Sequence, residues 1–458
     1  MINWLMINET VFFDRELELR ALKEEYRRSG FSFVVLFGRR RVGKTFLLRR
    51  FLSNKPNSLY LYVSEMPSPE LRESVAWEIR ERLGVRVPRN PSWRDIFSGV
   101  FRAARDRRII LAVDEFQRLV DVDRSALTDL QRVIDEEAAG TKLMLVVSGS
   151  AVGMIERFFR SGQPLYGRAT SFLKLKPFDF CTSCRFLRAR AGATPEEALM
   201  LYAVFGGTPY YLSLVESPSW SAEARRLILD NRSPLYYEPE FLLRTELRGS
   251  LVYFEVLRLL ASGKSSFSEL AGSLKTARTS VNYYLRVLIE DLDIVEREEP
   301  VLGGRPVYRV RDNFYRFWFR YVHPNRSLLE LGMVDEVLEK VERDFRSYLG
   351  LVFQDVVRES LHTLSLPFKP WKIGSWSGPE GEIDAVARDR EGEKVMVIEA
   401  KCKELGLREA EEVLAQLKLK ARRLPGAEKW YGIAALRVEG REELQREGYL
   451  VFELRDLC

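Results

Sequence analysis

The sequence lacks long apolar runs and is poor in cysteine and histidine. Its 458 residues contain no apolar run of about 18 residues, the length that a membrane-spanning helix needs, and the N-terminus shows no signal-peptide pattern. These absences favour a cytoplasmic protein that does not enter a membrane. Four cysteines are too few for a disulfide-stapled scaffold, and two histidines leave little room for catalysis by histidine. The C-x-x-C pair of Cys181 and Cys184 has no second pair with which to complete a zinc site.

The composition is that of a folded protein with several domains. Hydrophobic residues make up 46% of the chain and charged residues 30%, which argues against long disordered tails. The length predicts about three domains. The net charge of +6 is compatible with a nucleic-acid partner but does not require one.

A phosphate-binding loop is the strongest motif in the chain. Residues 38–45 read GRRRVGKT, with an apolar strand-like run at 33–37 before them and a helix-forming segment after them. Glycines let backbone N–H groups curve around a phosphate, and a helix N-terminus adds partial positive charge. No Asp or Glu occurs between Phe31 and Ser58. A chance glycine turn before an amphipathic helix is the alternative. We predict an ATP site formed by Gly38, Arg39, Arg40, Arg41, Val42, Gly43, Lys44, Thr45 and Phe46, with Lys44 at the β- and γ-phosphates and Thr45 on Mg²⁺.

Two further apolar strands are expected to end beside this loop. Residues 108–113 lead into Asp114 and Glu115, and residues 142–147 lead into Ser148. The carboxyl ends of parallel strands are where α/β sheets bind ligands. Asp114 is therefore predicted to hold Mg²⁺ and Glu115 to activate the attacking water, with Ser148 beside the γ-phosphate. A strand that simply exits into a charged turn is the alternative. Strands alternating with helices over 33–175 predict a parallel sheet with helices on both faces.

The middle of the chain predicts a helical lid and then a winged helix-turn-helix. The lid is interrupted by a Gly-Gly break at 205–211. Three helices and two strand-like runs follow between residues 250 and 310, the arrangement of a winged helix. Its candidate recognition helix carries side chains suited to DNA contacts: Arg278, Thr279, Asn282, Tyr283 and Arg286. Residues 264–291 hold only four basic against three acidic residues, so packing between domains is the alternative role.

The last part of the chain predicts a separate nuclease-like α/β unit. Residues 323–327 are expected to be a linker, followed by a helix over 345–360 and a hairpin of strands 381–387 and 394–400. In the hairpin Glu399 and Lys401 share a strand face and Asp384 comes beside them. Two carboxylates and a lysine at one place predict a metal site, with Asp384 and Glu399 as ligands, that attacks a phosphodiester. Such spacing also occurs by chance, so activity remains open.

The motifs together resemble those of the archaeal-type P-loop ATPases of the AAA+/STAND class that carry a C-terminal winged helix and a restriction-endonuclease-like PD-(D/E)xK domain. The matching segments are FDRELEL (13–19), GRRRVGKT (38–45), AVDEFQ (112–117), SGS (148–150), PLYGR (164–168), GGTPYYL (206–212) and FLLRTEL (241–247). The resemblance implies a multidomain α/β protein with an ATPase core (1–177), a helical lid (178–248), a winged helix (249–325) and a nuclease-like domain (326–458).

The resemblance also implies roles that the residues alone do not suggest. Arg15, Glu16 and Pro209 are expected near the adenine, Ser148 is expected to be the sensor, and Arg168 is expected to be an arginine finger in a homo-oligomeric ring or cluster. One residue departs from the pattern, because Gln354 occurs where such nucleases often have a glutamate. A neutral amide is a weaker Mg²⁺ ligand than a carboxylate.

These features favour a Mg²⁺-dependent ATPase that binds and processes DNA. The alternative is a nucleotide-switched regulatory protein whose C-terminal domain is a non-catalytic binding module. A site-specific transcription factor is a third interpretation, based on the winged helix alone.

Overall fold

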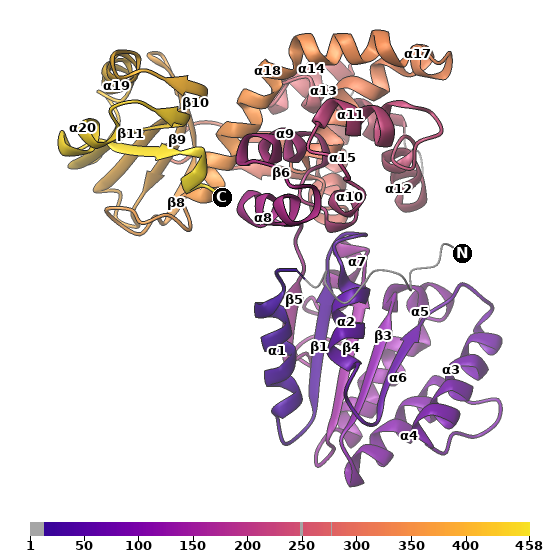
Figure 1. Cartoon of the computed structure of the whole chain (residues 1–458). Coiled ribbons are helices and arrows are strands. Elements are labelled where there is room, and N and C mark those ends of the chain that lie inside the picture. Colours follow the sequence, from indigo (N-terminus) through magenta and orange to yellow (C-terminus); the bar gives the residue numbers. More distant parts are fainter. Residues whose placement is uncertain (1–12, 248–250, 276) are drawn as a thin grey trace. The chain divides into compact units, whose positions relative to one another are not determined.

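The computed structural model describes residues 13–247, 251–275 and 277–458 and contains two compact units (Figure 1). The first unit ends at Lys176 and also takes in Glu290–Asp293. The second comprises Pro177–Ile289 and Ile294–Cys458. The predicted boundary between residues 248 and 249 lies outside the described residues. Within the described ranges, no helix is both long enough and apolar enough to cross a membrane.

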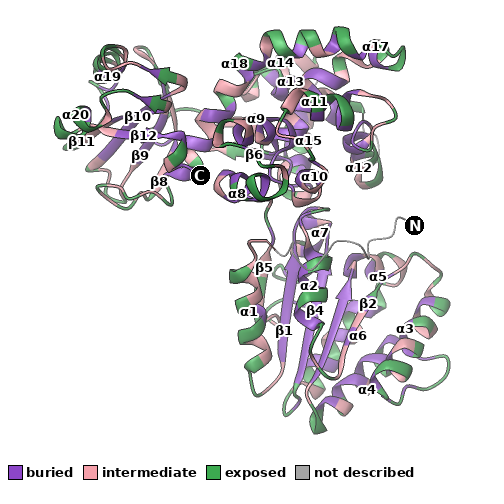
Figure 2. Cartoon of the chain, viewed as in Figure 1, coloured by how far each residue is buried: buried purple, intermediate pink, exposed green. Residues whose placement is uncertain are grey.

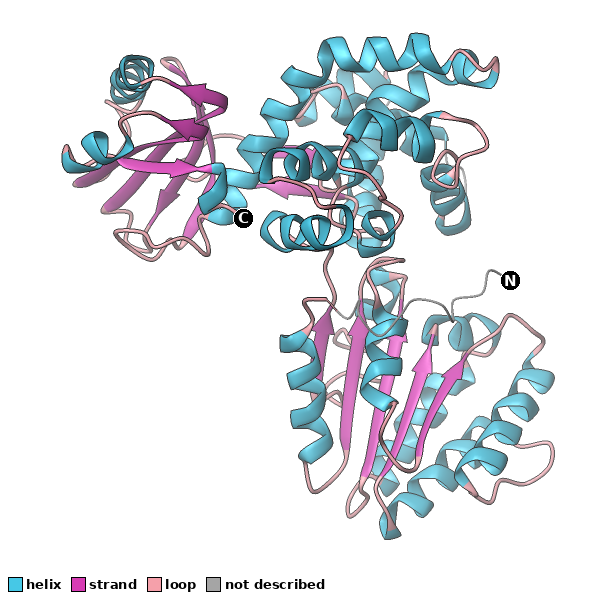
Figure 3. Ribbon diagram, in the orientation of Figure 1, coloured by secondary structure: helices cyan, strands magenta, loops and turns pink. Residues whose placement is uncertain are grey.

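The first unit is built on a five-stranded parallel sheet. Its strands lie in the order β2-β3-β4-β1-β5 and every neighbouring pair is parallel. The strands are β1 (Ser32–Phe37), β2 (Ser58–Tyr62), β3 (Ile109–Asp114), β4 (Leu143–Gly149) and β5 (Ser171–Lys174). The helices are α1 (Glu16–Arg27), α2 (Lys44–Leu52), α3 (Ser68–Leu83), α4 (Trp93–Asp106), α5 (Phe116–Val122), α6 (Ser125–Glu137) and α7 (Val152–Phe158). The predicted parallel sheet flanked by helices is confirmed (Figure 3).

The central strands are apolar throughout because both faces of the sheet are covered. Every residue of β1, β3 and β4 is buried (Figure 2). Alternate residues of β1 serve opposite cores: Val35 packs with the α3, α4 and α6 side, whereas Val34 packs with the α1 and α2 side. Burial on both faces fixes the register of a strand, because a slip of one residue exchanges the two sets of side chains. The carboxyl ends of β1, β3 and β4 therefore lie at one edge.

The second unit begins with short helices. They are α8 (Phe180–Ala191), α9 (Pro195–Phe205), α10 (Pro209–Ser213), α11 (Trp220–Ala224) with its π-helical continuation η3 (Arg225–Leu229), and α12 (Glu238–Glu246). The predicted Gly-Gly break separates α9 from α10. Gly206 ends α9 with φ 65°, and a Cβ on Gly207 would overlap the carbonyl oxygen of Phe178. Glycine is required at this second position because two backbone segments touch there.

Three helices and a two-stranded antiparallel hairpin follow. They are α13 (Leu251–Ala261), α14 (Phe267–Leu274), α15 (Arg278–Arg286) with its π-helical continuation η4 (Val287–Asp291), and strands β6 (Val295–Glu298) and β7 (Val307–Val310). Ser266 and Glu269 form a capping box at the start of α14, as the sequence predicts. On α15 the predicted DNA-facing side chains are exposed: Arg278, Thr279, Asn282, Tyr283 and Arg286.

The expected linker at residues 323–327 is wrong. The segment continues a helical path through α16 (Asn313–Phe317), η5 (Trp318–Val322), η6 (His323–Asn325) and α17 (Arg326–Glu330). The ring of His323 lies 5.8 Å from that of Trp318 and 5.6 Å from that of Phe319. This aromatic packing holds the segment in place although its sequence contains proline and asparagine. The following helix, α18 (Val334–Ser360), also begins earlier than predicted.

A second, mixed sheet completes the second unit. Its strands lie in the order β12-β11-β10-β9-β8, with β9 antiparallel to both neighbours and β11 parallel to both of its own. The strands are β8 (Lys372–Gly378), β9 (Gly381–Arg388), β10 (Lys394–Leu405), β11 (Glu428–Val438) and β12 (Leu450–Glu453). The helices are α19 (Leu407–Lys420), α20 (Arg441–Arg446) and the 3-10 turn η7 (Leu454–Asp456). The predicted hairpin is present as β9 and β10.

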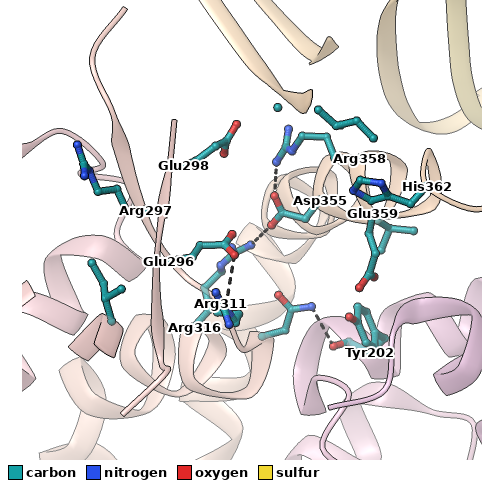
Figure 4. A pocket seen from close by; sticks show the side chains of 15 residues that line it. Tyr202, Glu296, Arg297, Glu298, Arg311, Arg316, Asp355, Arg358, Glu359 and His362 are labelled. Carbon is teal, nitrogen blue, oxygen red and sulfur yellow. Dashed lines mark hydrogen bonds and ion pairs between the residues drawn. The ribbon is translucent and has the colours of Figure 1, made fainter. Parts of the chain in front are cut away.

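A charged cluster on α18 holds the β6–β7 hairpin within this unit. Asp355 accepts hydrogen bonds from Arg309 (3.1 Å), Arg316 (2.7 Å) and Arg358. Asp355, Arg316 and Arg358 line a cavity of about 480 Å³ (Figure 4). Burial raises the pKa of Asp355, but the charges of Arg316, Arg358 and Arg309 outweigh burial and hold that pKa well below its usual range. The carboxylate is the common partner of all three guanidinium groups.

We expect Asp355→Asn to destabilise the protein by about 3 kcal/mol at neutral pH, because three partly buried guanidinium groups lose their counter-charge. The folded pKa of Asp355 is depressed, so its stabilisation is fully present above the unfolded pKa of about 4 and is lost as the pH falls below it. Urea unfolding at neutral and at acidic pH measures both effects. Asp335, an exposed residue of α18 that pairs with Arg225 of η3, provides the control, and Asp335→Asn should have no measurable effect. Equal losses in the two variants would contradict this account.

Candidate nucleotide-binding site

The loop between β1 and α2 has the backbone of an anion cradle. Gly38 and Gly43 have φ values of 154° and 98°, and Gly43 is the N-cap of α2. A Cβ on Gly38 would overlap the carbonyl oxygen of Leu175. Only glycine at position 38 therefore lets the loop come this close to the backbone that follows β5. Lys44 is buried and its Nζ donates to the carbonyl oxygens of Gly38 (2.7 Å) and Arg39 (2.8 Å). The loop thus closes around its own lysine.

The cation-binding end of the site joins α2 to β3. Thr45 Oγ1 donates to Asp114 Oδ2 at 2.7 Å, and Asp114 is buried. A hydroxyl and a carboxylate in contact at a helix N-terminus are oxygen donors of the kind that Mg²⁺ takes together with phosphate oxygens and water. These two residues lie together as the sequence predicts. The donor set fits the metal.

Tyr60 is a residue that sequence reasoning missed. Its hydroxyl donates to the same Asp114 Oδ2 at 2.6 Å. Burial, and next the charge of Asp114, raise the pKa of this phenol, which therefore stays protonated and keeps donating. Tyr60 lies on β2, the neighbour of β3, so only the strand order could have identified it.

Glu115 is turned out of the strand by its backbone. It has φ 57° and ψ 41°, a left-handed conformation that is uncommon for glutamate, and it is the N-cap of α5. Its carboxylate accepts hydrogen bonds from Ser150 Oγ (3.0 Å) and from Gln117 Nε2. Ser150 and Gln117 were missed as functional residues, although the segments SGS and AVDEFQ contain them. The three side chains form one polar cluster at the carboxyl edge of the sheet.

Ser148 lies inside β4 rather than beyond its end. The strand extends to Gly149, and Ser148 is paired in register with Leu36 of β1. Its Oγ is fully buried and has no hydrogen-bond partner among the described residues. A buried hydroxyl without a partner is costly unless a ligand or water completes it. The strand that contains it, β4, lies between β1 and β3.

Arg15 contacts the phosphate-binding loop directly. Its guanidinium donates to the carbonyl oxygens of Lys176 (2.7 Å) and Val42 (3.3 Å) and pairs with Glu18. Glu16 is exposed at the start of α1. Pro209, the other residue expected near the adenine, begins α10 in the second unit.

Arg168 lies at the end of the sheet where the parallel strands begin, whereas the phosphate-binding loop lies at the end where they stop. It precedes β5, close to Thr170, whose side chain accepts from the backbone N–H of Phe33 near the start of β1. Its guanidinium makes a two-pronged pair with Asp135 on α6, at 2.8 and 2.7 Å. The distance spanned by β1 therefore separates Arg168 from the phosphate-binding loop of its own chain.

The C-terminal hairpin brings together the residues predicted for a second site. Asp384 accepts from Gln354 Nε2 (2.7 Å) and from the Ala400 backbone N–H (2.8 Å), and Glu399 pairs with Lys401 (2.9 Å). Lys420 of α19, which sequence reasoning missed, also pairs with Glu399 at 3.0 Å. Burial is the main cause of the raised pKa of Asp384. Across the described part of the chain, no three His, Cys, Asp or Glu side chains gather as a metal-binding group.

Comparisons with known proteins agree with the nucleotide site. A family model described as an ATPase domain predominantly from Archaea matches residues 12–215, and one described as Archaea bacterial proteins of unknown function matches residues 318–413. An uncharacterized protein of Methanocaldococcus jannaschii, MJECL04, is 32% identical over 97% of this chain and 100% of its own length. An uncharacterized ATP-binding protein of Pyrococcus abyssi is 26% identical over 44% of this chain and 72% of its own length.

Solved structures share the fold. The Walker-type ATPase PABY2304 of Pyrococcus abyssi is similar with a TM-score of 0.52 at 22% identity, over 67% of this chain and 95% of that one. The ORC2 protein of Aeropyrum pernix, solved in ADPNP–ADP complexes, gives a TM-score of 0.47 at 16% identity, over 72% of this chain and 95% of that one. The first likeness shows a Walker-type ATPase fold, and the second is too distant to add to it.

Proposed function

The chain belongs to the family of its full-length Methanocaldococcus jannaschii relative and carries an archaeal-type P-loop ATPase domain, and we propose that this domain hydrolyses ATP with Mg²⁺. The observation that carries the proposal is the contact of Thr45 with Asp114 at the end of a loop closed around Lys44. The loop that would bind phosphate and the residues that would bind the divalent cation lie next to each other. A nucleoside triphosphate needs this arrangement because its phosphates are bound together with Mg²⁺.

Each residue of the site has a separate task. Lys44 exchanges the loop carbonyl oxygens for the phosphates, and Thr45 and Asp114 hold Mg²⁺. The ion supplies charge neutralisation on the phosphate oxygens. Glu115 takes a proton from the attacking water, while Ser150 and Gln117 orient its carboxylate. Ser148 donates its unpaired hydroxyl to the terminal phosphate.

We expect Lys44→Ala to abolish nucleotide binding, because the loop loses the buried ammonium group around which it closes and which would contact the phosphates. Glu115→Gln should bind ATP as the wild type does but hydrolyse it about a hundredfold more slowly or worse, because an amide cannot accept the proton. Binding is measured with a fluorescent ATP analogue and turnover by phosphate release. Lys55→Ala, which removes a lysine beyond α2, is the control and should leave both quantities unchanged. Wild-type turnover in Glu115→Gln would show that another group activates the water.

We also propose that the ATPase works as a homo-oligomer in which Arg168 serves the nucleotide of a neighbouring subunit. The support is its position beside the start of β1, whereas the phosphate-binding loop follows the other end of that strand. An exposed pair with Asp135 is weak enough, at about 1 kcal/mol or less, to be exchanged for a phosphate.

Mixing Arg168→Ala with Lys44→Ala subunits tests this proposal. Each variant alone should be inactive, but some mixed interfaces combine an intact loop with an intact arginine, so part of the phosphate release should return. Asp135→Asn is a matched control that frees the arginine without removing it and should remain active. Mixed oligomers, verified by native mass spectrometry, that show no recovered activity would contradict a role across the interface.

We further propose that the second unit binds DNA through α15 and the β6–β7 hairpin. The support is one exposed helix face with two arginines, an asparagine and a tyrosine. Arg286 and Arg278 are each held near an aromatic ring, those of Tyr283 (5.7 Å) and Phe267 (5.9 Å). Pre-ordered arginines on a helix suit phosphate and base contacts.

Cleavage of the bound DNA is the second candidate function. The hairpin that places Asp384, Glu399 and Lys401 together favours it. A metal ion there would take the place of Gln354 on Asp384 and of Lys420 on Glu399. If the site does not cut, the C-terminal sheet is a clamp or a nucleotide-controlled binding module.

Labelled single-stranded, duplex and branched DNA, incubated with Mg²⁺ or Mn²⁺ with and without ATP, tests both proposals. The double variant Arg278→Ala, Arg286→Ala should weaken binding at least tenfold and flatten its salt dependence by about two counterions. The double variant Arg232→Ala, Arg244→Ala, which removes two exposed arginines outside α15, is the charge-matched control. Metal-dependent cutting should be lost in both Asp384→Ala and Lys401→Ala. Binding without cutting would support the clamp, and the absence of binding would favour a regulatory ATPase.

A further inference from the structure

Two of the four cysteines meet in the second unit, although they are far apart in the sequence. Cys181 and Cys184 lie on successive turns of α8, and Cys458 follows η7. Cys458 Sγ donates to Cys184 Sγ at 2.6 Å, across a separation of 274 residues. The fold thus gives Cys184 a neighbouring cysteine from outside the C-x-x-C motif. Cys402, on β10, is the fourth cysteine.

The two sulfurs differ in access and in acidity. Cys184 is buried, whereas Cys458 and Cys181 are half-buried. The thiol of Cys458 donates to the sulfur of Cys184 and lowers its pKa, and the nearby charges of Arg188 and Arg185 act in the same direction. The same hydrogen bond raises the pKa of Cys458. A thiolate on Cys184 is therefore stabilised beside a second, more accessible sulfur.

We propose that Cys184 and Cys458 form a redox-modifiable site that closes to a disulfide by exchange with a low-molecular-weight disulfide. The accessible Cys458 passes its proton to the neighbouring Cys184 thiolate and attacks one sulfur of the oxidant. The S–S bond of the oxidant breaks, and the thiolate that leaves takes this proton from Cys184 and departs as a thiol. The Cys184 thiolate then attacks the sulfur of Cys458 and releases the second thiol. In sum, two cysteine thiols and one oxidant disulfide give one protein disulfide and two small thiols.

The disulfide would link α8 covalently to the segment after η7, which follows the last strand of the second sheet. The cysteine positions on α8 and after η7 belong to opposite ends of the second unit's sequence, so one covalent bond would close almost the whole unit into a loop. Such a bond removes conformational freedom from the unfolded chain. Cys181, one helical turn from Cys184, is the competing partner that an experiment must distinguish.

Oxidised glutathione is the probe for the test. Full-length protein is incubated with it under native conditions, remaining thiols are blocked, and peptides are mapped by mass spectrometry without reduction. We expect free thiols to fall from four to two and one cross-link, Cys184–Cys458, to form. Dithiothreitol should restore all four thiols. Cys458→Ser and Cys184→Ser should each abolish the cross-link, whereas Cys402→Ser should not affect it.

The same reaction on urea-unfolded protein is the matched control, because there the cysteines should cross-link without preference. Four free thiols after native oxidation would overturn the proposal. So would a dominant Cys181–Cys184 or Cys181–Cys458 bond, a mixed disulfide that stays on Cys458, or the same mixture of cross-links in folded and unfolded protein. The result is independent of ATP hydrolysis, so failure here leaves the proposed ATPase untouched.

Discussion

The hydrogen bond from Thr45 to Asp114 joins two residues 69 positions apart at 2.7 Å. It exists because β1 and β3 are parallel strands held on either side of β4, with all three buried on both faces. Strands buried on both faces tolerate no slip in register, because a shift of one residue would move every side chain of the strand to the opposite face of the sheet. The same constraint brings Ser148 and the Glu115 cluster to that edge. The chemistry of the site is thus a consequence of apolar packing several residues away.

Electrostatics and backbone strain act together at this edge. The loop carries no carboxylate of its own, so the negative partners of its cationic side chains come from elsewhere or from a ligand. The ammonium group of Lys44 donates to two carbonyl oxygens of the loop, which are weaker hydrogen-bond acceptors than the charged oxygens of a phosphate. Positive φ values gather at the same place, at Gly38, Arg41, Gly43 and Glu115. Two of these residues are not glycine, and strain of that kind persists only where the surrounding structure enforces it.

The sequence predicts those parts of the molecule that are specified locally. The loop, the end of a strand at Asp114, the capping box of α14 and the break before α10 each depend on a few adjacent residues, and each is found. The other predicted strand end is not at Ser148, because β4 continues to Gly149. The sequence could not identify Tyr60 and Lys420 as site residues. Tyr60 contacts Asp114 and Lys420 contacts Glu399, and in each pair the two residues are far apart in the sequence. The failed linker has the same cause. Local composition at His323 suggests a loop, but ring packing with Trp318 and Phe319 makes it helical.

The C-terminal hairpin shows how neighbours from outside a motif change its chemistry. Sequence spacing alone puts Asp384, Glu399 and Lys401 together, and the antiparallel pairing of β9 with β10 does so in the structure. Yet α18 adds Gln354 to one carboxylate and α19 adds Lys420 to the other. The two carboxylates and the two lysines balance in formal charge, and each carboxylate already has a hydrogen-bonding or ionic partner. A metal ion at this place would therefore have to displace Gln354 from Asp384 and Lys420 from Glu399.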